Sequence, residues 1–508
     1  ETSATVMQAP SPEHVARLLE ACAVLAAPPT HAAVADANGW IMGLAQSDEC
    51  WPTCLAALAQ TAPSDGHVLL SLCLSLVRQN RLTHAPSPEM LVPFVRHVWA
   101  GATEATPVRR QACTLLCALA CVDAHECDRL IGWALGLGVA DVALALHALQ
   151  DVGFEAFHRP LQSKPLSKLL RDASGDVLAF VEARAVEPSL RGLALACLQQ
   201  WVHAGVVLSD LVDLPNLANG LVASLKDGAS CQLGCEVLVE LVSSVECLPA
   251  RPAAVATLLR QLATDVAPAL CGGGGGGGGV AVVERAPQLH ALTRVAHALV
   301  RHEASELLSG ELRPCAESLV QQLVGVALSR AGELGPDRTT ALRPLWEALL
   351  HPAAWAALAL RPGRDGSALG PPCYEALLEV VLTRAMHCEG EGDDEGLERW
   401  RLEELHETLG IVGRQLGQPA ACERAGAALG AAWRQLPDWR PIEGALYCTC
   451  AMLRATAEPP LSCWHDLVRN VLTSLGTPAA QDTGGGSGGG GSGASSSGGG
   501  ASGSSLSD

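Results

Sequence analysis

The chain has few aromatic residues, since only 3% of its 508 positions are Phe, Trp or Tyr although 49% are hydrophobic. Globular β-sandwiches and most large enzymes use more aromatic side chains to fill their cores. A core of Ala, Leu and Val suits closely packed helices, because small side chains let helices approach one another. The scarcity of aromatic residues therefore favours an all-α protein.

Long apolar runs and an excess of basic residues are also missing. Asp, Glu, Arg, Gly or Pro interrupts every apolar stretch before it reaches the length that spans a bilayer, so we expect no membrane insertion. The 34 basic residues are outnumbered by 53 acidic ones, which gives a formal net charge of −19. Such a surface repels nucleic-acid phosphates and attracts basic proteins, so we expect no direct binding of nucleic acid.

The chain has 20 cysteines, but their spacing does not suggest a disulfide framework. Cys113, Cys117 and Cys121 recur at helical spacing in an apolar run, as do Cys231 and Cys235. Cysteines on one helix face behave as small buried hydrophobes in a reducing compartment, which predicts the cytosol or the nucleus. The first residue is Glu and no signal-peptide pattern follows it, so we expect a fragment of a longer protein.

Apolar residues recur at three- and four-residue spacing almost throughout, which is the pattern of amphipathic helices. Clear runs, separated by breaks that contain Pro or Gly, are Val68, Leu69, Leu72, Leu76 and Val77; Leu91, Val95 and Val98; and Ala112, Leu115, Leu116 and Leu119. Helices of about 12–18 residues would pair at a loose repeat of about 40–45 residues. The sequence predicts an α-solenoid of HEAT-like antiparallel helix pairs forming a right-handed superhelical arch, with another helical bundle as the alternative.

We divide the chain into three parts. Residues 1–150 are the expected N-terminal HEAT-like repeats, residues 151–476 are further repeats, and residues 477–508 are a Gly/Ser-rich segment expected to be disordered. The second part contains a glycine run at 272–279 and an acidic, Gly-rich loop at 389–398. No Lys-Ser or Lys-Thr follows the glycine run, so it is interpreted as a flexible insertion and not as a phosphate-binding loop.

Motifs for catalysis or metal binding are missing from the predicted repeats: H-E-x-x-H and C-x-x-C do not occur, and G-x-S-x-G occurs only at 485–489, inside the low-complexity Gly/Ser-rich segment. Gly136-Leu137-Gly138 lacks a preceding strand, and Cys448 and Cys450 would point in different directions on one helix. The cluster of Asp123, His125, Glu126, Cys127 and Asp128 can be interpreted as a metal site or, as we prefer, as a helix cap. We expect no catalytic residue, metal or cofactor, and no enzyme activity.

Two further groups of residues have alternative interpretations. The acidic residues of the 389–398 loop either form a solvated loop or contact a basic partner; they are Glu389, Glu391, Asp393, Asp394, Glu395 and Glu398. Several tryptophans fall inside predicted helices, where a large aromatic side chain usually locks neighbouring helices together. They are Trp40, Trp51, Trp133, Trp201, Trp346 and Trp400.

Ordered motifs resemble the importin-beta (karyopherin-beta) superfamily, and most closely its transportin-SR and importin-thirteen branch. Ala37-Asn38-Gly39-Trp40-Ile41 with Ser47 and Trp51 resembles the first-repeat pattern A-N-x-W-L…S…A-W. The helix from Val108-Arg109-Arg110-Gln111 to Ala120 resembles V-R-x-Q-x-C-x-A-L-A-x-L-A. Cys197-Leu198-Gln199-Gln200-Trp201 with Gly205-Val206-Val207 resembles C-L-x-S-W…G-V-L.

The resemblance continues to the end of the predicted repeats, with motifs around Trp346, around Arg399 and Arg401, and from Trp439 to Ala451. The segment Leu70–Ser75 departs from the branch's A-Q-x-L-x-x-K pattern. The resemblance implies that Trp40, Trp51, Arg109, Trp201, Trp346, Arg399, Arg401 and Trp439 are packing residues. Family members are about twice as long as this chain, so the resemblance covers their N-terminal half.

The resemblance implies a nuclear transport receptor that moves between cytoplasm and nucleus. Its expected partners are a Ran-type small GTPase in the GTP form, nucleoporins, and basic protein cargo such as SR-type splicing factors. The GTPase and an import cargo would exclude one another, and GTP hydrolysis would belong to the GTPase. A generic HEAT-repeat scaffold and an exporter of the same superfamily remain alternatives.

Overall fold

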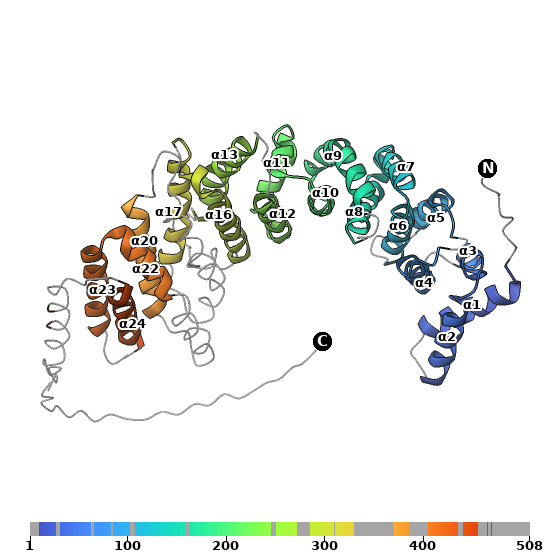
Figure 1. The fold of residues 1–508 in the computed structure, drawn as a ribbon, viewed down its shortest axis with the longest axis horizontal. Coiled ribbons are helices and arrows are strands. Elements are labelled where there is room, and N and C mark those ends of the chain that lie inside the picture. The colour runs from blue at the N-terminus through green and yellow to red at the C-terminus, as the bar shows by residue number, and fades with distance from the viewer. Residues whose placement is uncertain are drawn as a thin grey trace, which may run out of the picture. The chain divides into compact units, whose positions relative to one another are not determined.

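The computed structural model in Figure 1 describes a series of segments between residues 10 and 469. They are residues 10–26, 31–61, 66–82, 85–101, 107–158, 163–244, 250–271, 285–308, 310–329, 370–386, 405–434, 440–455, 465 and 469. Residues 1–458 form one compact unit, and residues 459–508 form another. Within the described segments every regular element is a helix and there is no strand, which confirms the predicted all-α fold class.

The first part of the array contains α1 to α10. Their bounds are α1 Pro12–Ala26, α2 His31–Leu44, α3 Cys50–Gln60, α4 His67–Arg78, α5 Pro88–Gly101, α6 Pro107–Ala120, α7 Ala124–Leu135, the 3₁₀ turn η1 Val139–Asp141, α8 Val142–Phe157, α9 Ser163–Ala185 and α10 Pro188–His203. The apolar runs identified in the sequence lie on α4, α5 and α6, and the breaks between those runs separate these helices.

The second part contains the 3₁₀ turn η3 and the helices that follow it. Their bounds are η3 Leu208–Leu211, α11 Pro215–Ser224, α12 Cys231–Ser243, α13 Arg251–Gln261, the π-helical turn η4 Leu262–Val266, α14 Ala267–Cys271, α16 Ala286–Leu307, α17 Arg313–Ser329, α20 Pro371–Met386, α22 His406–Leu416, α23 Gln418–Trp433 and α24 Arg440–Ala455. None of the described helices is both long and apolar enough to cross a membrane.

Successive helices pack as pairs, and successive pairs stack on one another. The pairs α5 with α6, α7 with α8, α9 with α10 and α11 with α12 are each in contact. The second helices make one row, in which α4, α6, α8, α10, α12 and α16 each contact the next, while α7, α9 and α11 make a parallel row (Figure 1). This arrangement is a helical repeat array. Its predicted right-handed superhelical course stays a prediction.

Bonds between side chains of neighbouring pairs reflect the length of the repeat. Ser71 and Gln111 are 40 residues apart, Arg110 and Asp151 are 41 apart, and Lys226 and Asp265 are 39 apart. The corresponding places in adjacent pairs are therefore close to 40 residues apart, at the lower end of the expected repeat.

One apolar cluster runs along the unit, from Val15 in α1 to Met452 in α24. It consists mainly of Leu, Val, Ala and Cys, and the only fully buried large aromatic side chains among the described residues are Trp51, Trp201 and Tyr374. The described cysteines are free thiols, and most of them are buried in this cluster, as their helical spacing predicted. The core is thus shared between pairs and does not belong to any one of them.

Some details differ from the expectation. Helix α9 has 23 residues, more than the expected 12–18. Helix α16 spans 22 residues but is kinked at Glu303, whose φ of −123° and ψ of 20° are not helical. Residue 150 lies inside α8, so the predicted division at 150/151 falls within a helix; whether it separates functional parts stays a prediction.

Close helix packing gives a first testable prediction. A Cβ atom placed on Gly444 of α24 would lie 1.9 Å from the carbonyl oxygen of Ala385 at the end of α20. Because a backbone oxygen cannot rotate away, Gly444→Ala should lower the free energy of unfolding by about 2 kcal/mol or more. Gly430→Ala in neighbouring α23 is the matched control, since its Cβ would meet nothing within 4 Å. We expect thermal denaturation followed by circular dichroism to show a lower midpoint for the first variant and an unchanged or higher one for the second.

Candidate functional site

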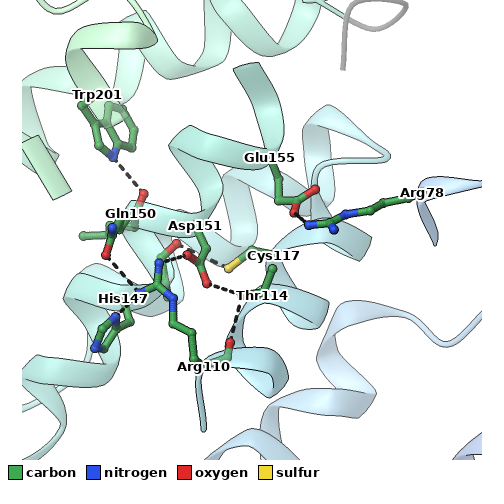
Figure 2. A network of polar contacts seen from close by, with 11 residues as sticks. Arg78, Arg110, Thr114, Cys117, His147, Gln150, Asp151, Glu155 and Trp201 are labelled. Carbon is green, nitrogen blue, oxygen red and sulfur yellow. Dashed lines mark hydrogen bonds and ion pairs between the residues drawn. The ribbon is translucent and has the colours of Figure 1, made fainter. Parts of the chain in front are cut away.

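A network of polar side chains connects α4, α6 and α8 within the first row of helices (Figure 2). Its centre is formed by Asp151 and Glu155, which lie one turn apart on α8 and are each only 3% exposed. Figure 2 shows Asp151 directed to Arg110 and Thr114 of α6, and Glu155 directed to Arg78 at the end of α4. A buried carboxylate needs charged or hydrogen-bonding partners, and each of these two has them.

The distances indicate strong bonds. Arg110 donates to Oδ1 of Asp151 at 2.6 Å, and Arg78 donates to Oε1 of Glu155 at 3.0 Å. Oδ2 of Asp151 lies 2.8 Å from the hydroxyl of Thr114, which is also 2.9 Å from the carbonyl oxygen of Arg110. Since a hydroxyl has one proton, Thr114 donates to the ionised carboxylate, or accepts from the protonated one while donating to the carbonyl.

Arg110 also bonds to the residue directly before Asp151 and to the residue one turn before it on α8. It donates to Oε1 of Gln150 at 3.0 Å and to Nδ1 of His147. Because a guanidinium can only donate, His147 is neutral here, with its proton on Nε2. The imidazole packs edge-on against Trp99 at 5.4 Å between ring centroids, and Arg109 lies 5.5 Å over the same indole. The guanidinium of Arg110, which bonds to three side chains of α8, therefore fixes the register of α6 against α8.

Burial changes the acidities of this network. It raises the pKa of Asp151 to about 6, although Arg110 and Thr114 act in the opposite direction. Burial, followed by the positive charge of Arg110, lowers the pKa of His147 to about 4. Between these two values a proton resides on Asp151 and not on His147, which is the reverse of their order in water.

Two thiols adjoin the network. Cys113 and Cys117 lie one turn apart on α6, and their sulfur atoms and a carboxylate oxygen of Asp151 are all within 4.8 Å of one another. This donor set has the residue types of a metal site. However, both oxygens of Asp151 already have protein partners, and the Cys117 thiol lies 3.4 Å from the carbonyl oxygen of Ala148, to which it donates. Burial also raises the pKa of Cys117, which disfavours the thiolate that a metal would need. We therefore assign these groups to helix packing.

The tryptophans of the sequence motifs are core residues where the structure describes them. Trp51 and Trp201 are 2% and 0% exposed, and their indole nitrogens donate to the carbonyl oxygens of Arg81 and Leu149 at 2.8 and 2.9 Å. The predicted packing role is confirmed for both. Trp40 is half-buried, with the guanidinium of Arg17 5.2 Å from its ring. Trp133 is likewise half-buried, and Arg96 lies 5.8 Å from its ring.

The motif that follows Trp201 is a helix stop. Gly205 has a φ of +113°, which favours glycine, and its N–H bonds to the carbonyl of Val202. The N–H of Val206 bonds to the carbonyl of Trp201, and the Val206 side chain is buried. This pair of bonds is the Schellman arrangement, which ends α10 and directs the chain into the next pair.

Other sequence predictions can be compared directly. The carboxylate of Asp123 accepts from the backbone N–H groups of His125 and Glu126 at 2.8 and 3.2 Å, so the interpretation as a helix cap is confirmed. Cys448 is buried and Cys450 is exposed, as expected for two positions on different faces of α24. The Gly136–Gly138 segment connects α7 to η1 and follows a helix.

Several predicted residues lie outside the described segments. They are Glu389, Glu391, Asp393, Asp394, Glu395 and Glu398 of the acidic loop, Trp346, Arg399, Trp400, Arg401 and Trp439 of the motifs, the glycine run 272–279, and residues 477–508.

The sequence motifs did not indicate the centre of the network. The family motif points to Arg109, which lies against Trp99, whereas it is Arg110, 40% exposed, that pairs with buried Asp151. A signal was present in the sequence: two carboxylates lie four residues apart in the largely apolar stretch 142–157, and buried acids require a cation from a neighbouring helix.

The ion pair of Arg110 and Asp151 gives the second prediction. Arg110→Met removes the cation beside a buried carboxylate, so it should lower the free energy of unfolding at pH 7.5 by about 3–5 kcal/mol. The loss should be smaller at pH 5, where Asp151 holds a proton. Arg129→Met is the control, because Arg129 is about as exposed as Arg110, 43% against 40%, but its partners Glu89 and Glu126 are 60% and 26% exposed, whereas Asp151 is 4% exposed. Urea denaturation should show a loss of less than about 1 kcal/mol for it at either pH.

The third prediction concerns pH. The raised pKa of Asp151 stabilises the folded state fully below pH 4, and this stabilisation is lost as pH rises through 6. The lowered pKa of His147 stabilises the folded state fully above pH 6.5, and this stabilisation is lost as pH falls through 4. The two effects oppose one another in the wild type. Relative to it, His147→Gln should lose stability as pH rises between 4 and 6, and Asp151→Asn should lose it as pH falls. Each slope is at most about 1.4 kcal/mol per pH unit. Parallel pH profiles for the two variants would contradict these assignments.

Comparison with known proteins identifies no relative of this chain. No family model matches the chain, and no curated protein matches its sequence. The importin-beta resemblance therefore rests on the quoted motifs alone.

Proposed function

We propose that the chain is the N-terminal part of a nuclear transport receptor of the importin-beta type. It binds a Ran-type small GTPase in the GTP form, and it carries basic protein cargo, such as SR-type splicing factors, from cytoplasm to nucleus through contacts with nucleoporins. The receptor itself performs no covalent chemistry. Binding of the GTPase and of cargo are linked through the stacked helix pairs, so that each expels the other.

The observation that carries the proposal is the correspondence between the motifs and the repeat structure. The first motif lies on α2 and α3 and buries Trp51, the second lies on α6, and the third ends α10 with Trp201 and Gly205. Each motif thus occupies the part of a helix pair where a packing or a helix-ending residue is needed. Motifs that occur in order at such places support descent from one repeat array.

Physical properties of the array support a protein ligand. Successive helices of one row present their exposed side chains over many repeats, which suits contact with a large partner. The net charge of −19 gives long-range attraction to basic surfaces and favours rapid association with them.

A generic helical-repeat scaffold is the second candidate, and one observation favours it. Trp51 and Trp201 are core residues, and a scaffold of any function needs such residues to join its repeats. An exporter of the same superfamily is the third candidate, and it would bind the GTPase and cargo together.

The fourth prediction separates these candidates. Immobilised full-length chain should retain purified Ran loaded with a non-hydrolysable GTP analogue and not Ran loaded with GDP. A basic cargo protein should be released when the GTP form is added. A Ras-type GTPase carrying the same analogue is the control for specificity.

Equal retention of the GDP and GTP forms, or retention of neither, contradicts the proposed function and leaves the scaffold. Cargo that binds more tightly when the GTP form is present indicates an exporter.

A further inference from the structure

Two phenylalanine side chains lie exposed at the end of α8. Phe154 is 38% exposed and Phe157 is 57% exposed, although the whole chain has only four phenylalanines. The other two, Phe94 and Phe180, pack partly buried against the core. Adjacent exposed aromatic side chains cost hydrophobic free energy in the free protein, and they commonly mark a surface that binds a partner.

Rings and a carboxylate continue from these phenylalanines across two neighbouring helices. His158 stacks on Phe154 with 4.1 Å between ring centroids, and Phe157 faces His203 at the end of α10 at 5.5 Å. Nε2 of His203 is 2.8 Å from a carboxylate oxygen of Glu240 on α12. We call Phe154, Phe157, His158, His203 and Glu240 the end row.

The end row is held in place from within the helices. His158 directly follows α8, and its Nδ1 donates to the carbonyl oxygen of Phe154 at 2.8 Å, because a carbonyl can only accept. The ring also meets Phe157 nearly at right angles, with 5.3 Å between centroids. The aromatic surface is therefore preorganised, and a ligand would lose little entropy in ordering it.

The electrostatics of the end row favour a cation. The contacts between Phe157, His203 and Glu240 bring together the carboxyl-terminal turns of α8, α10 and α12. Such helix ends carry partial negative charge. The last turns of α8 and α12 contain no basic residue, and that of α10 contains only His203. Glu240, with a side chain 38% exposed and paired with His203, adds a further negative charge, whereas the charge of Arg78 is balanced by buried Glu155.

We propose that the end row binds an arginine side chain within a basic segment of a partner protein. The planar guanidinium stacks on the exposed ring of Phe157, and its N–H groups bond to the carboxylate of Glu240. Lysine fits less well, because a compact ammonium neither stacks as a plane nor bonds a carboxylate in a bidentate way. Phe154 and His158 cover the aliphatic part of the bound segment.

This inference deepens the proposed function, since it names a place on the array where a basic cargo would be held. Its test contains no GTPase, so the two can fail independently. If the chain retains Ran but does not recognise arginine, the proposed function stands and the role of the end row is contradicted. If it recognises arginine but does not retain Ran, the chain is an arginine-binding scaffold.

The fifth prediction uses a short fluorescent peptide of alternating arginine and glycine, titrated with the full-length chain and followed by anisotropy. Phe157→Ala and Glu240→Gln should each weaken binding by about threefold to tenfold, since each removes one of the two contacts with the guanidinium. A peptide with lysine in place of arginine should bind more weakly than the arginine peptide.

Matched controls separate recognition from general charge and from folding. Met90→Ala removes another exposed apolar side chain, and Asp172→Asn removes another exposed carboxylate on α9. Neither should change binding. Circular dichroism should show all four variants folded like the wild type, because Phe157, Met90 and Asp172 are exposed and half-buried Glu240 is replaced by a glutamine of the same shape. Absence of binding, equal loss in Asp172→Asn and Glu240→Gln, or no preference for arginine over lysine would each overturn the proposal.

Discussion

Each helix pair of the array must bury apolar side chains against the pairs before and after it. The apolar cluster from Val15 to Met452 is continuous for this reason, and an isolated pair would expose much of its share to water. Helices can approach closely because most of the core consists of Ala, Val, Leu and Cys, and at Gly444 a single added methyl group would meet the backbone of α20. The composition, poor in aromatic residues, and the stacked architecture are thus two aspects of one constraint.

Apolar packing alone leaves the register between neighbouring pairs loosely determined, because one leucine can replace another with little cost. Buried charges remove this freedom. Asp151 reaches its partners only when α6 and α8 are aligned so that Arg110 and Thr114 face it, and any shift leaves a carboxylate without a bond in the core. The carbonyl of Leu149 adds a similar restraint from the other side, where it accepts from Trp201 of α10.

Periodicity was sufficient to predict the helices and the packing roles of Trp51 and Trp201, because both follow from neighbours within a few residues. It could not identify Arg110, since that residue differs from Arg109 only in what lies opposite it on a helix about 40 residues away. The end row was missed for the same reason: Phe154 and Phe157 have core-like chemistry and core-like spacing, and only the ends of α8 and α10 together place them at the surface. Local patterns predict elements, whereas sites depend on register between elements.

This distinction also bears on function. The motifs that resemble transport receptors are carried, where described, by residues that pack or end helices, so natural selection for stacking alone could maintain them. Partner choice must instead depend on side chains that the stack leaves exposed at helix ends, where substitution costs little stability. A repeat array can therefore keep its core motifs and change its ligand. For this chain, the chemistry of exposed residues such as Phe157 and Glu240 is the more informative guide to what it binds.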